Sequence, residues 1–306
     1  MIQYDAHKWT HHLLDIKGSV VRQIFWRVML FVVWSGAVVA FHFYVRPVGV
    51  PSTVHTLIGV ALGLLLVFRT NASYERFWEG RKLWGGIVNE SRNIAREAAA
   101  FLRERPDLLR PVVLWTAAFP YAAMNSLRGG RGLGPVAERL PKGEVSDTLA
   151  ARHVPSAVAR RISSHLVRAR DEGQISDYIA ATIDSNVNLL IDYVGSCERI
   201  QKTPLPFAYV VHLRRALILY CLTLPFALVE TYGWSTTGDT LLIAYILFGI
   251  EEIGVEIENP FDEDDNDIPL DQICATIEGN LMAVLEETGS ARPESDSSYA
   301  EMAAGQ

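Results

Sequence analysis

Basic residues are missing from a long part of the sequence. No Lys or Arg occurs between residues 216 and 291, although the whole chain contains 28 of them. The same interval holds fifteen Asp and Glu residues, nine of which lie between residues 251 and 269. The net charge of the chain is −7, which disfavours a general role in binding nucleic acid. We therefore expect no nucleic-acid partner.

Cysteine is scarce, and motifs that carry catalysis are absent. The three cysteines, Cys197, Cys221 and Cys274, are odd in number and far apart. They form neither a disulfide framework nor a Cys-x-x-Cys metal site, so we expect buried free thiols. The sequence has no Gly-x-Ser-x-Gly and no His-Glu-x-x-His motif, and its eight histidines are scattered. We therefore predict that the protein is not an enzyme.

Two long apolar runs occupy the first quarter of the chain. Residues 28–45 carry no formal charge, and their length meets the threshold of about 18 residues for a membrane-spanning helix. A short turn-forming stretch, 46–51, connects them to the uncharged residues 54–68. Lys and Arg cluster before the first run and after the second, with one Arg between them. This distribution predicts a two-helix hairpin with both ends on the cytoplasmic side.

Two further apolar segments near the C-terminus contain charges. Residues 205–229 include His212, Arg214 and Arg215, and the apolar run 240–250 is followed by two Glu residues. Both segments are short for membrane spans by hydropathy alone. Charged groups are tolerated at membrane depth when they face protein or water. The three basic side chains are interpreted as an inter-helix hydrogen-bonding group rather than as the polar centre of a membrane enzyme.

No segment has the pattern of a β-strand, so the predicted fold class is all-α. The predicted organisation is an N-terminal segment with a transmembrane hairpin, a cytosolic helical region, a second transmembrane pair, an acidic turn with a C-terminal cytosolic helix, and a disordered tail. Their boundaries are 1–70 (spans about 28–45 and 54–69), 71–204, 205–258, 259–288 and 289–306.

The helix predicted over residues 54–85 has an apolar row on one face. Val60, Leu64 and Phe68 are spaced at i, i+4 and i+8, which aligns them along the helix. Gly59 and Gly63 form a small-xxx-small pair, which allows another helix to approach closely. We hypothesise that the row is the apolar neck of a pore. The alternative is a stripe that faces lipid or packs in the protein core.

The acidic turn follows the last apolar segment. Clustered carboxylates and carbonyls suit hard cations such as Ca²⁺, so a divalent cation is one interpretation of residues 258–271. The run is not an EF-hand, because Asp267 stands where that loop has Gly when counted from Asp262. The alternative is a solvated acidic turn after a helix.

Two motifs carry a resemblance to a known family. The segments FRTNASYERFWEGRKLWG (68–85) and NPFDEDDND (259–267) resemble the bacterial branch of the bestrophin family, and the similarity extends over about residues 1–288. The resemblance implies a homopentameric ion channel with four membrane helices per subunit, a helical cytosolic body and one pore on the five-fold axis. Each subunit would then have four identical partners, together with membrane lipid and permeating monovalent ions.

The resemblance also implies roles for particular residues. The family's apolar neck falls on Val60, Leu64 and Phe68, which agrees with the row found from spacing. A lower cytosolic constriction falls on Tyr178. The family's Ca²⁺ clasp maps to 259–267, with Asn259, Asp264 and Asp267 as the residues that would contact the ion. The bacterial branch is implied to be independent of Ca²⁺, so no cofactor is required and a bound divalent cation stays open.

The resemblance thus implies a pentameric channel, and together with the charge distribution it predicts a multi-pass protein of the cell (inner) membrane with both termini cytoplasmic. Its apolar neck would gate small monovalent ions by dewetting. The ion sign is open between chloride or other anions and Na⁺- or K⁺-type cations. The net acidity favours cations, whereas Arg69, directly after Phe68, favours anions. The competing function is a non-conducting, membrane-anchored helical scaffold or sensor.

Overall fold

The computed structural model describes residues 18–290, and all regular structure in this range is helical. This confirms the all-α prediction. The predicted tail is described only as far as Ser290, where the last helix ends. The rest of the tail and the N-terminal residues 1–17 lie outside the described range. The chain divides into two compact units, residues 1–81 with 200–268 and residues 82–199 with 269–306, and each is treated separately below.

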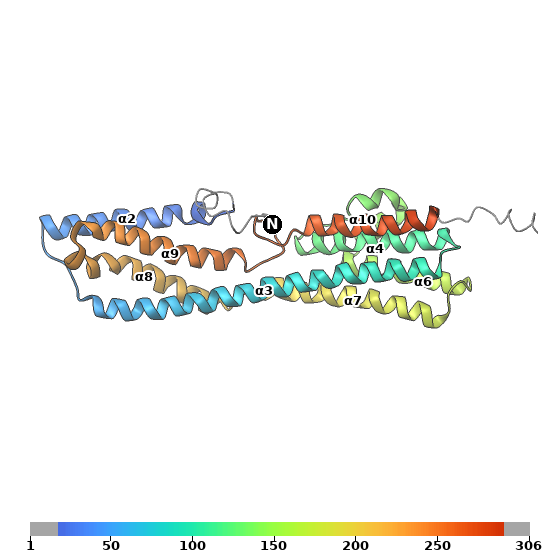
Figure 1. The fold of residues 1–306 in the computed structure, drawn as a ribbon, viewed down its shortest axis with the longest axis horizontal. Helices are drawn as coiled ribbons and strands as arrows, with labels where there is room; N and C mark the ends of the chain where they lie inside the picture. Colours follow the sequence, from blue (N-terminus) through green and yellow to red (C-terminus); the bar gives the residue numbers. More distant parts are fainter. Residues whose placement is uncertain (1–17, 291–306) are drawn as a thin grey trace, which may run out of the picture. The chain divides into compact units, whose positions relative to one another are not determined.

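Unit 1 is a bundle of four long helices. Its elements are α2 (Val21–Tyr44), the first part of α3 (Ser52–Phe101), α8 (Phe207–Tyr232), the 3-10 turn η2 (Gly233–Ser235) and α9 (Thr236–Glu256). Helix α2 packs along α9 and α8, as Figure 1 shows. Helix α3 continues well past the apolar run because no Pro interrupts it. The predicted boundary at residue 70 therefore lies inside this helix.

One hydrophobic core joins all four helices of unit 1. Phe31 of α2 stacks on Phe248 of α9, with ring centroids 5.5 Å apart. Leu62 and Leu66 of α3 and Leu217 of α8 are buried in the same cluster. Because each helix contributes to this core, each has one packed face and one face that its own chain leaves open.

Among residues 18–290, three stretches are long and apolar enough to cross a membrane: Val21–Tyr44, Ser52–Phe101 and Phe207–Glu256. The third contains both α8 and α9. Within its most apolar window, α3 is only 17% buried, compared with 33% for each of the other two stretches. These helices expose apolar surface that water would not solvate favourably, as expected of a membrane protein.

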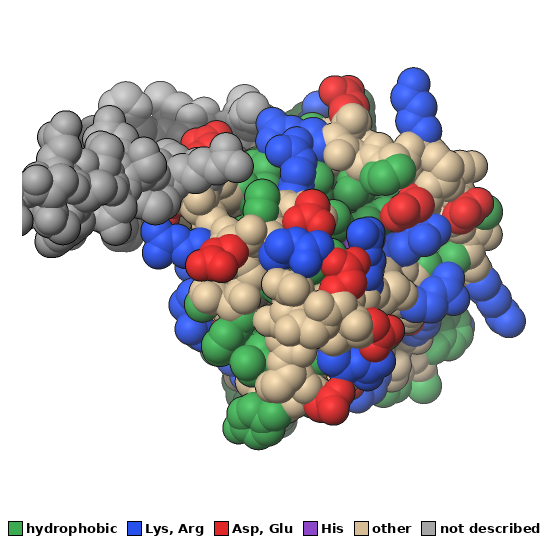
Figure 2. All heavy atoms as spheres, turned by 90° about the vertical axis from the view of Figure 1, so that its right-hand side faces the viewer, with side chains coloured by type: hydrophobic (Ala, Val, Ile, Leu, Met, Phe, Trp, Pro, Cys, Tyr) green, Lys and Arg blue, Asp and Glu red, His purple; other side chains and the backbone are tan. Residues whose placement is uncertain are grey.

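Unit 2 is organised around α4 (Pro106–Leu127). It also contains η1 (Pro135–Arg139), α5 (Lys142–Ala150), α6 (Val154–Asp171), α7 (Asp177–Lys202), α10 (Leu270–Ser290) and the second part of α3. Helix α4 packs against α6 and α10, and its Trp115 and Phe119 are fully buried. Figure 2 shows one face of this unit, on which Lys and Arg alternate with Asp and Glu. Such a mixed charged surface is typical of a body in contact with water.

All three cysteines are buried and outside any disulfide, as predicted from their number and spacing. Cys197 and Cys274 belong to unit 2, and Cys221 belongs to the core of unit 1. Burial raises the pKa of the Cys274 thiol to about 12. A buried thiol with a raised pKa is chemically inert at neutral pH, because the thiolate is the reactive form.

Candidate functional site

The predicted row on α3 points away from the core of its own unit. Val60, Leu64 and Phe68 are 70%, 55% and 56% exposed. The opposite face of the same helix is packed, since Leu62 and Leu66 are among the fully buried side chains. The structure therefore brings the three predicted residues into one exposed apolar row. Convergence of such rows on a shared axis requires further copies of the chain and stays a prediction.

The two predicted packing glycines differ. A methyl group added at Gly59 would lie 2.8 Å from the hydroxyl oxygen of Tyr220 on α8, so this glycine permits a close approach. A methyl group at Gly63 would meet no atom within 4 Å. His55, one turn before Gly59, stacks on Tyr220 with ring centroids 4.3 Å apart. The start of the row is thus held against α8, whereas Gly63 has open space beside it.

A buried ion pair fixes the end of the row. Arg69 follows Phe68 directly but lies on the packed face, where its side chain is 1% exposed. Its Nη1 donates to Glu251 Oε1 of α9 at 2.7 Å, and Glu251 is itself only 3% exposed. The Nε of Arg214 on α8 donates to the same oxygen at 2.9 Å. The expectation that Arg69 provides an anion-favouring charge beside Phe68 is therefore wrong, because its charge is turned inward and neutralised.

The ion pair belongs to a network that reaches all four helices of unit 1. Arg27 of α2 donates to Glu252 at 2.5 Å, and its Nη1 lies 3.7 Å from Glu251 Oε2. Arg69 Nη2 lies 3.8 Å from Glu258 Oε2. Removing one partner of a buried ion pair strongly destabilises a protein, because the other charge stays buried without compensation. The Arg214 contact is also the inter-helix interaction that the sequence favoured over a membrane enzyme site.

Arg76 lies in the motif that carried the family resemblance, and its side chain donates hydrogen bonds to backbone carbonyl oxygens. Its guanidinium donates to the carbonyl oxygen of Glu258 at 2.9 Å, to that of Ile200 at 2.7 Å and to that of Thr203. Three donors of one side chain thereby satisfy carbonyls at the two chain segments that enter and leave the α8–α9 pair. Sequence reasoning identified the motif but not this role.

The acidic turn is built around Asp267, which is buried. Its Oδ2 accepts the backbone N–H of Asp264 at 2.8 Å, and Asn259 Nδ2 donates to Asp262 Oδ2 at 2.6 Å. Burial, together with the nearby negative charges of Asp264 and Asp262, raises the pKa of Asp267 to about 6. The turn is thus closed by its own hydrogen bonds.

A cation at this turn stays a prediction. Asn259 Oδ1 and Asp267 Oδ1 are buried without hydrogen-bond partners, and oxygens of this kind fit a hard cation. Within residues 18–290, however, no three His, Cys, Asp or Glu side chains are placed together so that they could hold a metal ion. The predicted set of Asn259, Asp264 and Asp267 contains an amide oxygen and only two carboxylates, so this observation does not bear on it and the set stays a prediction.

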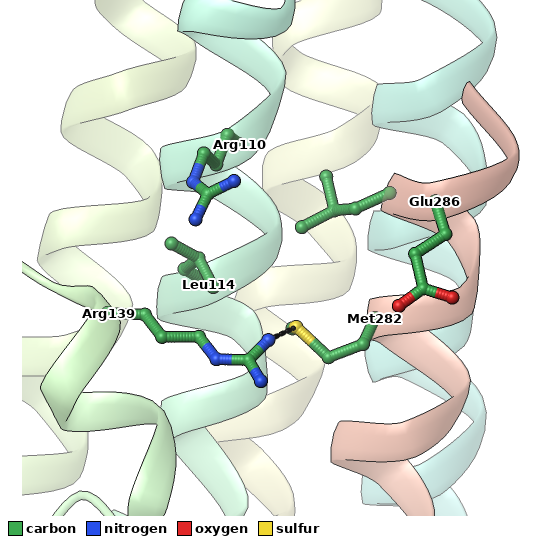
Figure 3. A pocket seen from close by; sticks show the side chains of 6 residues that line it. Arg110, Leu114, Arg139, Met282 and Glu286 are labelled. Atoms are coloured by element: carbon green, nitrogen blue, oxygen red, sulfur yellow. Dashed lines mark hydrogen bonds between the residues drawn. The ribbon is translucent and has the colours of Figure 1, made fainter. Parts of the chain in front are cut away.

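Tyr178 and a surface pocket lie in unit 2. Tyr178 is in the first turn of α7 and is 81% exposed, so its ring is available to line a passage or to meet another copy. A separate pocket of about 180 Å³ is lined by Arg110, Leu114, Arg139, Met282, Leu285 and Glu286. Arg139 donates to the Met282 sulfur at 2.9 Å (Figure 3). No predicted site residue lines this pocket.

Comparison with known proteins decides the family. Residues 1–283 match the family described as bacterial/fungal bestrophin protein. The chain belongs to the bestrophin family. This bestrophin is 40% identical over 283 residues to the voltage-dependent anion channel-forming protein sll1024 of Synechocystis, covering 91% of this chain and 92% of that protein. It is 31% identical over 289 residues to the voltage-dependent anion channel-forming protein YneE of Escherichia coli K12, covering 94% and 95%.

Solved structures support the same conclusion. The crystal structure of a bacterial bestrophin homologue from Klebsiella pneumoniae superposes with a TM-score of 0.81 at 30% sequence identity. The match covers 86% of this bestrophin and 98% of that chain. The family predicted from the two sequence motifs is therefore confirmed, over almost the whole described range.

Proposed function

We propose that this bestrophin is a homopentameric ion channel whose central pore narrows at Val60, Leu64 and Phe68. Small monovalent ions are the proposed permeating ions. The relatives, which are named anion channel-forming proteins, favour chloride or another anion. The net charge of −7 favours Na⁺- or K⁺-type cations as the other candidate.

The observation that carries the proposal is the exposed apolar row of α3. Its three bulky side chains are uncovered, while the residues behind them are buried in the protomer core. Interactions at both ends fix the direction of the row: His55 stacks on Tyr220 at one end, and Arg69 pairs with Glu251 at the other. A surface with such a fixed direction is suited to forming a ring with identical surfaces of other copies.

A narrow ring of these side chains would control ion flow without a binding site. Apolar groups offer an ion nothing to replace its hydration shell, so a constricted apolar neck loses its water and closes. Widening the neck by about the width of one side chain would restore the water column. In this proposal the helix moves at Gly63 when the neck widens, because Gly63 lies between the two fixed ends of the row and has open space beside it.

The first test is Leu64→Ala in the full-length protein, reconstituted in lipid vesicles. The substitution enlarges the neck, so ion flux should rise above that of the wild type. The mass of the detergent-solubilised oligomer should correspond to five chains. Monomers or dimers without ion flux would instead support the non-conducting scaffold or sensor.

The remaining features of the proposal follow from the channel assignment. The protein is proposed to be a multi-pass protein of the cell (inner) membrane, with four spanning helices, α2, α3, α8 and α9, and both termini in the cytoplasm. Its partners are four identical subunits and membrane lipid, and conduction needs no cofactor. If a divalent cation binds the acidic turn, Ca²⁺ should raise the thermal unfolding temperature of the wild type but not that of Asp267→Asn.

A further inference from the structure

The exposed row of α3 does not end at Phe68. Asn71, Glu75 and Trp78 follow at spacings of three, seven and ten residues from Phe68, and all three are exposed. Because a helix has 3.6 residues per turn, these spacings return to nearly the same direction. On the opposite face, Ser73 and Gly80 continue the buried side of the helix. The apolar row and the residues after it therefore share one face within unit 1.

The two basic groups nearest the end of the apolar row are already committed elsewhere. Arg69 is buried and paired with Glu251. Arg76, adjacent to Glu75 in the sequence, directs its guanidinium to three backbone carbonyls. Glu75 itself makes no ion pair or side-chain hydrogen bond within the described part of the chain. It is the first charged side chain on the face after the apolar row.

We infer that Glu75 is a specificity-determining residue, which raises the local concentration of cations and lowers that of anions at the cytoplasmic end of the neck. This inference rests on the proposed function, since a ring of five carboxylates requires five copies around one axis. Rings of Asp or Glu side chains are a known means of favouring cations in channels.

The distance from Phe68 allows this charge to act on the neck. Seven residues of helix rise about 10 Å, which is close to the Debye length at 0.1 M salt. The field of a carboxylate ring at this position therefore reaches the neck in dilute salt and is screened in concentrated salt. The apolar row decides whether ions pass, and Glu75 decides which sign is disfavoured.

The test is the reversal potential of the full-length protein in planar bilayers under an asymmetric NaCl gradient. Glu75→Gln should raise the permeability of Cl⁻ relative to Na⁺ by about tenfold in dilute salt. Glu75→Lys should raise it further, and Glu75→Asp should match the wild type. The difference between Glu75→Gln and wild type should shrink in 1 M NaCl, where the Debye length is about 3 Å.

The controls separate this inference from the proposed function. Glu104→Gln removes an exposed carboxylate outside the row and should leave the reversal potential unchanged. If Leu64→Ala increases the current while Glu75→Gln keeps wild-type selectivity, the inference is wrong and the channel assignment stands. If no variant conducts, Leu64→Ala included, the proposed function fails and the inference fails with it. Loss of the oligomer in Glu75→Gln would assign Glu75 a structural role and would also overturn the inference.

Discussion

Two apolar helices of this protein are buried to opposite extents. In α4, 16 of 22 residues are buried, because α6 and α10 cover it on several sides. In the apolar part of α3, the most apolar window is only 17% buried, and Val60, Leu64 and Phe68 are among its exposed large side chains. Similar composition therefore serves two purposes. Helix α4 is the core of a water-facing body, whereas α3 leaves apolar side chains exposed, which the proposed function assigns to lipid and to other copies of the chain.

The largest effect is expected from shortening a covered side chain. Trp115→Ala in α4 should lower the free energy of unfolding by about 3–5 kcal/mol, because it leaves a cavity that its neighbours cannot fill. Leu64→Ala on α3 should change it by no more than about 0.5 kcal/mol. Denaturant unfolding in detergent, followed by intrinsic fluorescence, would measure both. Equal losses would mean that Leu64 is covered in the assembled protein.

The second prediction concerns the ion pair on the covered face of α3, at the end of the exposed row. Glu251→Ala leaves the buried Arg69 guanidinium without its hydrogen-bonded carboxylate, with only Glu258 at 3.8 Å, and should cost about 3–5 kcal/mol. The double variant Arg69→Met with Glu251→Met should cost clearly less than Glu251→Ala, since no charge then stays buried on α3. A double-variant cost equal to the sum of the single-variant costs would show that the two residues act independently.

These two cases show how far the sequence could be read. The spacing of Val60, Leu64 and Phe68 was enough to predict the row, and two motifs were enough to predict the family. The inward direction of Arg69 could not be predicted, because its partner Glu251 is 182 residues away and no local pattern links them. The open space at Gly63 was equally invisible, since a glycine spacing does not say which helix is its neighbour.

The helices extend beyond the predicted spans for a related reason. The first span was predicted to cover about residues 28–45, after Arg27. The helix that contains these residues begins earlier, at Val21, and Arg27 is accommodated in it by its ion pair with Glu252. Hydropathy identifies the uncharged part of a helix. The helix itself can also include charged side chains, such as Arg27, when they have partners.

The contrast between covered and exposed positions also applies to carboxyl groups. The pKa of buried Asp267 is raised from 3.8 to about 6, so the folded state binds more protons than the unfolded state between these values. The stability that this group provides is therefore greatest at low pH and falls as pH rises from about 4 to about 6. Thermal unfolding across this pH range should show that slope in the wild type and a flatter one in Asp267→Asn. If Asp267→Asn shows the same slope as the wild type, the pH dependence of stability comes from other groups.

The smallest effects are expected at the two glycines of α3. Gly59→Ala places a methyl group against the Tyr220 hydroxyl and should lower stability slightly, because that ring must shift. Gly63→Ala meets no neighbour in the protomer and should leave stability unchanged or raise it by up to about 1 kcal/mol through helix propensity. Thermal unfolding of the detergent-solubilised oligomer compares the pair. A loss at Gly63 alone would place a second subunit against it.

The three buried thiols have a practical value for experiments on this protein. Because Cys197, Cys221 and Cys274 are all enclosed, a water-soluble thiol reagent at neutral pH should label the folded native chain only slowly. Single cysteines can then be introduced along α3, at Val60 or Glu75 for example, without first replacing the native ones. Labelling rates from each side of the bilayer would report directly which of these positions water can reach.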